Sequence, residues 1–545
     1  MATGGELLVG VLEDAGVDVV FGLPGVHNLP AWRALAGSPI RLITVRHEQA
    51  AAYAADGYSR ATGRLGVALT TTGPGAANTL GAVGEAWASR SSVLVIATDI
   101  STALRRPGVY RGVLHETTDQ PGMFAPVTKA VFRAGRPRDL PDEAEAAVAA
   151  ALTAPTRPVY LELPTDVLAG EGPRDLGEPP PPPAPPAGPE DGALTAALDL
   201  LKRAGRPLLW AGGGALQSGA GSALGDLAER LGAPVFTTYS ARGLLGADHP
   251  CAVGLPPHVP EAGRLWDDAD LVIAVGSDLD GMMTQNWAMP APRRLVAINV
   301  DPADAAKSWE PDVLIEADAR AAVEALAAHV APRGEVETCA DGLARLRHDV
   351  RRSLRREHPR ELAFVDEVGR ALPEDAIVVC DMCIPGYWLA GFHRVPGPRR
   401  LQYPMGWGTL GFAFPAALGA ALAGRGPVVS VSGDGGFLYA CGELATVAQE
   451  RISLTAVIVD DSGYGMLRYD QRHAGDPVFG VDLESPDFEA MAVSFGIRAE
   501  TVDGLGSAFG DALGRHAAME VPSVLVARAE LEPPPTTSPR WYRKG

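Results

Sequence analysis

A chain of 545 residues is too long to fold around one hydrophobic core, so its length predicts about three domains. The formal net charge of −19 argues against nucleic acid or an acidic membrane surface as a partner, because both require a basic patch. With 46% hydrophobic and 21% charged residues, the composition is typical of a globular protein, and we expect a cytoplasmic enzyme.

The apolar stretches are strand-sized and are broken by Gly, Asp or Pro, so we expect no membrane-spanning helix. The first 22 residues have no basic start, and they predict an amphipathic helix followed by a short strand rather than a signal peptide. Five cysteines are too few for a disulfide framework. Cys380 and Cys383 form a single CxxC pair, which we interpret as a strand end plus a loop thiol because a metal site would need a second pair.

Short runs rich in Val, Ile and Ala alternate with helical patterns along the whole chain. Continuous apolar runs of this kind, separated by helices, predict parallel strands that are buried on both faces. The fold class is therefore α/β, with three consecutive domains that each contain an open parallel sheet. The clearest strand runs are residues 65–72, 92–99, 206–214, 270–278, 294–302, 375–381 and 454–461.

Two segments divide the chain into these domains. The segment "EPPPPPAPPAGPEDG" (178–192) predicts an extended spacer, because proline at this density joins neither sheet nor helix. The second boundary is a basic, polar helical run around residues 345–362. We expect domains at 1–172, 193–335 and 359–535, linkers at 173–192 and 336–358, and a tail at 536–545.

Two apolar runs of the third domain end in carboxylates beside glycines. The first stops at "GDGG" (433–436), and the second, after a crossover helix, stops at "DDSG" (460–463). Because ligands bind beyond the carboxyl ends of parallel strands, we expect both acidic ends to lie side by side at one sheet edge. Oxygen ligands next to a turn whose N–H groups face an anion predict Mg²⁺ bridging a diphosphate. Either cluster alone would be better explained as a helix cap or a solvated turn, and the prediction depends on the two occurring together at this spacing.

This pair of segments resembles the thiamine diphosphate motif, in which GDG is followed by an Asn-Asn pair and a glycine. The family contains acetolactate synthase, pyruvate decarboxylase and benzoylformate decarboxylase, and the chain looks most like the acetolactate synthase large subunit. The resemblance implies thiamine diphosphate and Mg²⁺ as cofactors, with Asp434, the side chain of Asp461 and the carbonyl of Gly463 as metal ligands. The chain departs from the pattern at Asp460-Asp461, where the family usually has asparagines. We expect the added charge to tighten metal binding, because the cation lies between the two anions.

A second block, "YPMGWGTLGFAFPAALGAAL" (403–422), resembles the part of the family that bends the cofactor. The resemblance implies that Leu410 lies between the two cofactor rings and that the carbonyl of Gly408 accepts a hydrogen bond from the 4′-amino group. Without the flanking glycines, Leu410 would be read as ordinary packing at a helix start. The remaining cofactor contacts that the resemblance implies are Gly73, Cys383, Gly433, Gly435, Gly436 and Tyr464.

A third block, residues 44–87, resembles the pyrimidine-binding domain of the family, and its glutamate aligns with Glu48. In isolation such a glutamate is a helix-capping residue. The resemblance implies that Glu48 hydrogen-bonds the pyrimidine N1′ and favours the imino tautomer, whose 4′-nitrogen removes the C2 proton. The three domains would then be pyrimidine-binding, central and diphosphate-binding. Because Glu48 and the metal motif lie on different domains, the resemblance implies a cofactor shared between subunits of a homodimer or homotetramer.

The central domain holds FAD or a nucleotide in some members of the family. Its triple glycine, Gly212–Gly214, is equally explained by a tight turn. The stretch that accompanies FAD in the family reads "GSDLDGMMT" (276–284) here. We therefore do not expect bound FAD.

Members of the family add a 2-oxo acid to the cofactor and expel carbon dioxide, and they differ in what the resulting enamine meets. Pyruvate decarboxylase-like enzymes have an Asp after the early glycine, a His-His pair and a Glu beyond the metal loop. In this chain the corresponding positions hold Val26, followed by His27, then His115 with Glu116, and Leu467. Two of these four positions are apolar, which disfavours simple decarboxylation.

We expect the pocket residues to divide by role. The predicted catalytic residues are Glu48, His115, Glu116 and Gln120, and the predicted substrate contacts are Val26, His27, Met466 and Leu467. A surface turn before the next strand is the alternative for the segment from His115 to Gln120. The sequence favours a carboligase that joins the decarboxylated fragment to a second carbonyl substrate. The alternatives are a decarboxylase that releases an aldehyde and a cofactor-binding subunit without catalytic activity.

Overall fold

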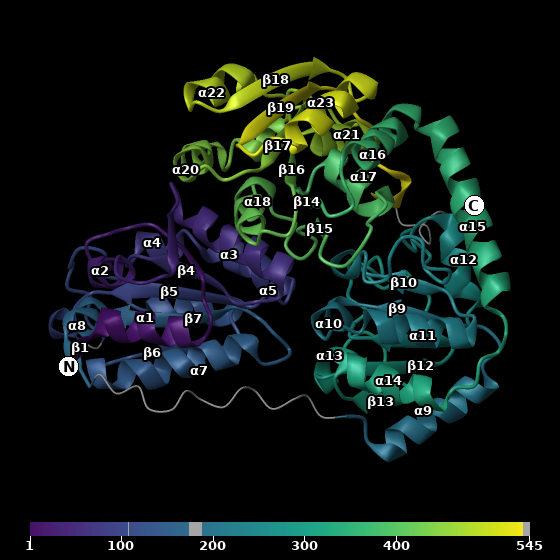
Figure 1. Cartoon of the computed structure of the whole chain (residues 1–545), viewed down its shortest axis with the longest axis horizontal. Coiled ribbons are helices and arrows are strands. Elements are labelled where there is room, and N and C mark those ends of the chain that lie inside the picture. Colours follow the sequence, from purple (N-terminus) through teal and green to yellow (C-terminus); the bar gives the residue numbers. More distant parts are fainter. Residues whose placement is uncertain (107, 174–187, 538–545) are drawn as a thin grey trace.

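The computed structural model describes residues 1–106, 108–173 and 188–537, which form three α/β units (Figure 1). Each unit is built on its own sheet, and every strand pairing within these three sheets is parallel. The predicted fold class, three consecutive α/β domains with open parallel sheets, is confirmed. Among the described residues, no helix is long and apolar enough to cross a membrane.

The N-terminal sheet has six strands in the order β3-β2-β4-β5-β7-β6. Its strands are β2 (Val19–Gly22), β3 (Arg41–Thr44), β4 (Gly66–Thr70), β5 (Val93–Asp99), β6 (Val131–Arg133) and β7 (Val159–Pro164). The helices around it are α1 (Gly4–Asp14), α2 (Leu29–Leu35), α3 (Glu48–Thr62), α4 (Pro74–Ala77), α5 (Leu80–Ala88), α6 (Gln120–Phe124), α7 (Leu140–Leu152) and α8 (Thr165–Ala169). A short antiparallel pair, β1 (Ala2–Thr3) with β8 (Glu171–Gly172), brings the two ends of this unit together.

The central sheet has five strands in the order β10-β9-β11-β12-β13. They are β9 (Pro207–Ala211), β10 (Val235–Thr237), β11 (Leu271–Val275), β12 (Leu295–Asn299) and β13 (Val313–Glu316). The helices are α9 (Asp191–Arg203), α10 (Gly213–Gln217), α11 (Gly221–Leu231), α12 (Pro260–Asp268), α13 (Pro302–Ala306) and α14 (Ala319–His329). Of the predicted Pro-rich linker, residues 174–187 lie outside the described residues.

The C-terminal sheet has six strands in the order β15-β14-β16-β17-β19-β18. They are β14 (Ile377–Cys380), β15 (Leu401–Gln402), β16 (Val428–Gly433), β17 (Thr455–Asp460), β18 (Arg498–Asp503) and β19 (Ser523–Arg528). Its helices are α16 (Pro359–Ala371), α17 (Ile384–Phe392), α18 (Ala413–Leu422), α19 (Asp434–Phe437), α20 (Leu444–Glu450), α21 (Gly465–Ala474), α22 (Phe488–Ser494) and α23 (Ser507–Ala517). Cys380 ends β14 and Cys383 precedes α17, and both thiols are free.

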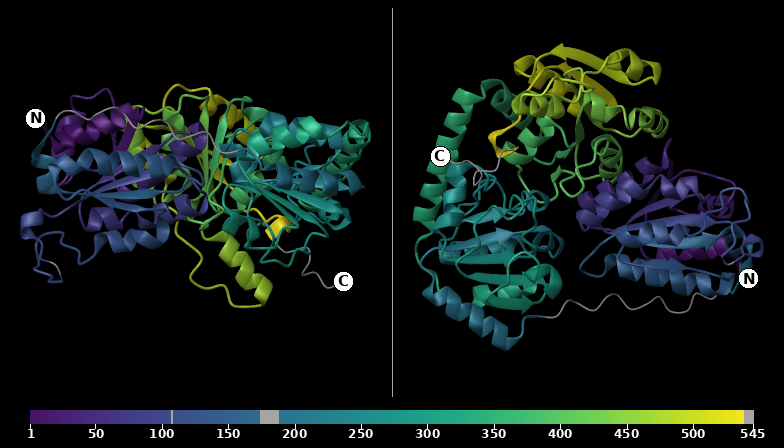
Figure 2. Two further views of the ribbon diagram at one scale, coloured as in Figure 1. Left: turned by 90° about the horizontal axis from the view of Figure 1, so that it is seen from below. Right: turned by 180° about the vertical axis from the view of Figure 1, so that it is seen from behind.

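Helix α15 (Val336–Glu357) occupies the second predicted boundary and runs along the outer side of the central and C-terminal units (Figure 1). The predicted tail at 536–545 is described only as far as residue 537. Figure 2 shows that the segment containing α21 projects away from the body of the molecule. The carboxyl end of β17 leads into this projecting segment, so the second acidic strand end lies at its base.

The N-terminal and C-terminal units pack through α3 and α18, whose facing surfaces are small or apolar. A Cβ added at Gly57 would come within 2.0 Å of the carbonyl oxygen of Ala416, and one added at Gly419 within 1.8 Å of that of Ala54. The two helices therefore touch backbone to backbone, which only glycine allows at these points. Next to this contact the rings of Tyr53 and Phe412 meet edge to face at 5.5 Å.

Candidate functional site

The two acidic strand ends lie next to each other, because β16 and β17 are neighbouring parallel strands. Gly433 pairs with Val459 in the register, so the next residue of one strand lies beside the end of the other. Asp434, which is 1% exposed, begins α19. Its Oδ2 accepts a hydrogen bond from the Gly463 backbone N–H at 2.9 Å and one from the Ser485 hydroxyl at 2.8 Å. Its Oδ1 is buried and has no hydrogen-bond partner among the described residues.

Asp461 lies next to Asp434, and the two carboxylates repel each other. Burial first and the Asp434 charge second raise the pKa of Asp461 to about 7. Burial also raises the pKa of Asp434. A buried and a half-buried carboxylate side by side at one sheet edge are stabilised by a cation between them. The described residues hold no cluster of three or more His, Cys, Asp or Glu side chains suited to a metal, so a cation here would add peptide and ligand oxygens to its shell.

Arg468 fixes the loop that carries the second acidic end. This buried side chain donates to the backbone oxygens of Asp461 and Ser462, at 3.1 and 2.9 Å. It also pairs with Asp482 at 2.8 Å, across the loop that returns after α21. The loop therefore holds its shape through an arginine that lies outside the motif itself.

A cavity of about 180 Å³ adjoins the acidic pair. All of its lining residues belong to the C-terminal unit, and none comes from the unit that carries Glu48. The predicted cofactor and substrate residues that line it are Cys383, Leu410, Gly433, Gly435, Gly436, Asp461, Gly463, Tyr464, Met466 and Leu467. Residues from segments that are distant in the sequence thus line one cavity.

The loop that carries Leu410 requires glycine on both sides. Gly408 and Gly411 have φ angles of +69° and +76°, in the left-handed region that other residues rarely adopt. Just beyond this loop, the buried Asp381 Oδ1 accepts from the backbone N–H groups of Phe412 and Ala413, each at 2.8 Å. Burial raises the pKa of Asp381 to about 6. This carboxylate fixes the start of α18 and with it the position of the loop.

Glu48 lies at the other half of the candidate site, at the first turn of α3. It is 7% exposed, and its Oε2 accepts a hydrogen bond from the Asn78 side-chain amide at 3.0 Å. A Cβ added at Gly75 would stand 3.3 Å from its Oε1, so glycine leaves this oxygen uncrowded. Glu48 is therefore a buried side chain whose Oε2 is engaged by Asn78, while none of the described residues donates a hydrogen bond to its Oε1.

Gln120 holds the adjacent loop in place. Its Oε1 accepts from the Gly73 backbone N–H at 2.6 Å, where Gly73 has a φ of +62°. Its Nε2 donates to the Thr98 carbonyl, the Tyr160 hydroxyl and Glu162. Both ends of the amide are engaged inside the N-terminal unit, so Gln120 acts here by positioning Gly73.

Two imidazoles meet beside Gly73. The rings of His27 and His115 lie edge to face with their centroids 5.3 Å apart. His27 Nε2 and His115 Nδ1 are both buried without a hydrogen-bond partner among the described residues. Burial, followed by the nearby His115, lowers the pKa of His27. His115 has a φ of +67°, a strained conformation of the kind that concentrates at functional sites.

The other two predicted residues of this half lie differently. Val26 is 70% exposed next to the histidine pair. The Glu116 Oε2 accepts from the backbone N–H groups of Arg111 and Val113, at 2.9 and 3.0 Å, and so closes its own turn. Sequence reasoning missed Ser485, Arg468, Asp381 and Asn78; only Asn78 lies in a block that the resemblance covered.

Comparisons with known proteins agree with this geometry. Three protein-family models match: thiamine pyrophosphate enzyme, N-terminal TPP binding domain (residues 2–123), central domain (194–326) and C-terminal TPP binding domain (382–527). The chain is 37% identical over 497 residues to a probable 2-ketoarginine decarboxylase, AruI, of Pseudomonas aeruginosa, covering 91% of this chain and 88% of that protein. It is 33% identical over 524 residues to a probable acetolactate synthase large subunit of Methanocaldococcus jannaschii, covering 92% and 87%.

A solved structure shares the fold. The thiamine diphosphate-dependent 4-hydroxybenzoylformate decarboxylase of Rhodococcus jostii superimposes with a TM-score of 0.82, covering 97% of this chain and 100% of that one. The sequence identity is 24%, so this likeness concerns the fold.

Proposed function

Because the chain belongs to the thiamine pyrophosphate enzyme family, we propose that it decarboxylates a 2-oxo acid and protonates the remaining carbon to release an aldehyde. The observation that carries this proposal is the His27–His115 pair beside Gly73, with an unpaired ring nitrogen on each imidazole. The bond between the 2-oxo carbon and the carboxylate carbon breaks, carbon dioxide leaves, and one proton takes its place on the 2-oxo carbon, which becomes the aldehyde carbon. An imidazole that has taken up a proton on such an open nitrogen can deliver it to that carbon.

Thiamine diphosphate supplies an electron sink for the bond that breaks. The residues fit such a group, since Asp434 has a buried unpaired oxygen and Asp461 a pKa raised toward neutrality. Together with the Gly463 carbonyl they would hold Mg²⁺ against the diphosphate, in an all-oxygen shell. Leu410 and the glycines of residues 433–436 would surround the remainder of the cofactor in the adjoining cavity.

Glu48 would bind the aminopyrimidine end of the cofactor through its open oxygen. The Asn78 hydrogen bond orients the carboxyl group, and burial keeps water away from it. A carboxyl group held in this way exchanges a proton with the ring nitrogen that it contacts.

We place these two halves together in a homodimer. The cavity beside Asp461 has no lining residue from the unit that carries Glu48. Large apolar side chains are exposed around both halves: Val26, Leu104, Val109, Tyr110 and Leu114 on one, and Leu438, Tyr439, Leu467 and Phe479 on the other. Exposed apolar surface of this kind marks an interface. A second copy that covers these patches would bring Glu48 of one chain to the acidic pair of the other.

Subunit complementation tests the shared site. Glu48→Gln and Asp434→Ala each inactivate one half, and chains with different tags are co-expressed so that mixed dimers form. In a mixed dimer one site carries both changes and the other carries none, so random assembly restores about one quarter of the wild-type activity. No restored activity in purified mixed dimers would show that both halves of a site come from one chain.

A second outcome of the reaction is carboligation, which the sequence alone favours and in which the same carbon adds to a second carbonyl. Met466 and Leu467 favour it, because they make the cavity wall beside the acidic pair apolar and supply no proton. The relatives named above include both reaction types.

Product analysis separates the two outcomes. The purified protein is incubated with thiamine diphosphate, Mg²⁺ and one 2-oxo acid at a time, namely pyruvate, 2-ketoarginine or 4-hydroxybenzoylformate, with and without an added aldehyde. Mass spectrometry should find the aldehyde in a one-to-one ratio to carbon dioxide for at least one acid. A hydroxyketone or hydroxy-oxo acid as the main product would establish carboligation instead.

Variants of the histidine pair sharpen this test. His27→Phe and His115→Phe should slow aldehyde release while carbon dioxide loss from a single turnover continues. His329→Phe is the matched control, because this exposed histidine lies at the end of α14 in the central unit. Equal rates of aldehyde release in all three variants would remove the imidazoles from the proton step.

Flavin is not part of the proposal. The crevice of the central unit contains Asp278, which pairs with Arg90 at 2.9 Å and with Lys307. Asp304 also pairs with Arg90 and Lys307, so these cations already have carboxylate partners. We expect no bound flavin. A purified protein that shows the visible absorption band of flavin would contradict this expectation.

A further inference from the structure

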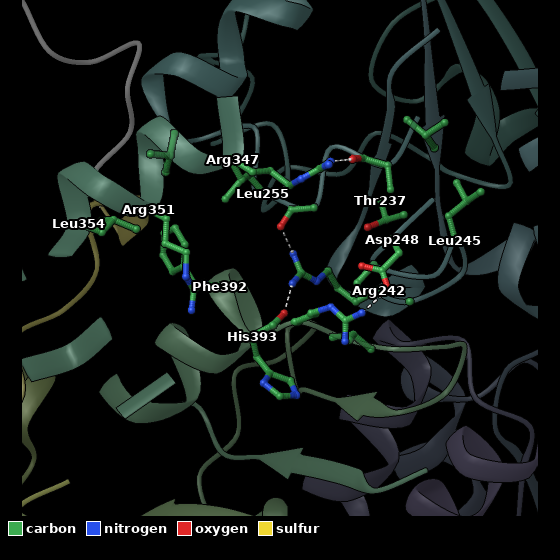
Figure 3. A pocket seen from close by; sticks show the side chains of 18 residues that line it. Thr237, Arg242, Leu245, Asp248, Leu255, Arg347, Arg351, Leu354, Phe392 and His393 are labelled. Carbon is green, nitrogen blue, oxygen red and sulfur yellow. Dashed lines mark hydrogen bonds and ion pairs between the residues drawn. The ribbon is translucent and has the colours of Figure 1, made fainter. Parts of the chain in front are cut away.

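A cavity of about 410 Å³ lies where the central unit, α15 and the C-terminal unit meet (Figure 3). The central unit contributes the end of β10 and the loop that follows it, through Arg242 to Leu255. Helix α15 contributes Arg347 and Arg351, and the C-terminal unit contributes residues 392–395. No residue of the candidate active site lines this cavity, so it is a separate place in the molecule.

The lining of this cavity is strongly basic. It contains Arg242, Arg347, Arg351 and Arg394 against one acidic residue, Asp248. Arg394 is paired with Asp248, and Arg351 with Asp366 from α16. Neither Arg242 nor Arg347 has a carboxylate within ion-pair distance among the described residues.

Arg242 reaches only backbone oxygens. It is 8% exposed, and its guanidinium donates to the carbonyls of Gly254, Gly391 and His393, at 3.4, 3.2 and 2.6 Å. Arg347 likewise donates to the carbonyl of Ala252. Burial lowers the pKa of Arg242 to about 10, which reflects the missing counter-charge. A buried cation without an anion is costly unless a ligand supplies the opposite charge.

His393 adds a neutral hydrogen-bonding group to the same wall. It is 7% exposed, and its Nδ1 has no hydrogen-bond partner among the described residues. Burial, and then the charges of Arg242, Arg351 and Arg394, lower its pKa to about 4. The ring is therefore uncharged near neutral pH and does not compete with the arginines for an anion.

We propose that this cavity binds a small organic anion, a carboxylate or phosphate monoester with an apolar body. The guanidinium groups of Arg242 and Arg347 would take the anionic end, in the charge-assisted geometry that arginine favours. The apolar body would lie against the hydrophobic part of the wall, which consists of Val235, Leu245, Leu255, Val350, Leu354, Phe392 and Val395. The volume is that of an ordinary small-molecule site.

The position of the cavity gives such a ligand a structural effect. Its walls come from three separate parts of the chain, so one bound anion contacts the central unit, α15 and the C-terminal unit together. A ligand that binds only the folded arrangement stabilises it by mass action. The expected signature is a melting temperature that rises with ligand concentration.

The experiment uses the enzyme saturated with thiamine diphosphate and Mg²⁺, so that the diphosphate site is occupied. The probes are inorganic phosphate, hexanoate and phenyl phosphate, measured by calorimetric titration and thermal unfolding. Phenyl phosphate or hexanoate should bind more tightly than inorganic phosphate, because only these carry an apolar body. Absence of binding for all three probes would overturn the proposal.

Three variants locate the site. Arg347→Gln should weaken binding by about tenfold or more, the equivalent of one lost charge-assisted hydrogen bond. Arg352→Gln is the matched control, because this exposed arginine of α15 pairs with Asp349 and does not line the cavity. Lys307→Gln tests the crevice of the central unit as a competing anion site. Loss of binding in Lys307→Gln but not in Arg347→Gln would overturn the assignment, and so would equal affinity in all variants.

Discussion

The backbone contact between α3 and α18 predicts that Gly57→Ala destabilises the protein. The new Cβ would stand 2.0 Å from the Ala416 oxygen, whereas ordinary contact begins at 3.4 Å, so the helices must separate by 3.4 − 2.0 = 1.4 Å. All three nearest atoms are backbone atoms, which cannot rotate away as a side chain does. Overpacking of this kind costs about 3 kcal/mol, and alanine recovers about 1 kcal/mol through its higher helix propensity. The net loss is about 2 kcal/mol.

Calorimetry measures this loss, with a control from another helix. A loss of about 2 kcal/mol lowers the melting temperature of a domain of this size by about 4–8 °C. Gly369→Ala in α16 is the control, because a Cβ there meets no atom within 4 Å. It should raise stability by up to about 1 kcal/mol. A Gly57→Ala protein that melts at or above the wild-type temperature would refute the argument that these backbones touch.

Three further predictions concern the cofactor half-sites and pH. Glu48→Gln should greatly slow loss of the C2 proton of thiamine diphosphate, followed by hydrogen–deuterium exchange, while cofactor binding stays intact; unchanged exchange would remove Glu48 from the mechanism. Asp461→Asn should weaken Mg²⁺ binding in a metal titration, because one anionic ligand is lost; markedly tighter cofactor binding would contradict this. His393 has a folded-state pKa of about 4, below its unfolded value, so its contribution to stability is present above pH 6.5 and is lost as the pH falls. Between pH 7 and 5 the loss is about 2 kcal/mol, and denaturant unfolding of His393→Phe should show a correspondingly flatter pH dependence.

Much of the architecture could be predicted from the sequence, because buried parallel strands are marked by short apolar runs. The run that ends at Gly433 and the run that ends at Asp460 both became strands, and they pair as neighbours. Their adjacency follows from the short crossover between them, through α20, which leaves the chain little choice of partner strand.

Some supporting residues of the site could not be predicted, because they come from distant parts of the chain. Ser485 reaches Asp434 across 51 positions, and no local pattern marks a serine for that role. Gln120 and Glu116 show the converse. Their residue types suit a pocket, but tertiary contacts engage both groups within their own unit. Only the folded chain shows which polar groups are already satisfied.

The packing of α3 against α18 also determines whether activity or secondary structure is lost first on heating. One of them starts at Glu48 and the other follows directly after the loop of Leu410, so their contact fixes the spacing between the two half-sites of one chain, which in the proposed homodimer belong to two different active sites. A slight separation of the N-terminal and C-terminal sheets would therefore stop catalysis well before the polypeptide loses its secondary structure. Inactivation would precede melting, and the central unit could remain folded in an enzyme that has already stopped working.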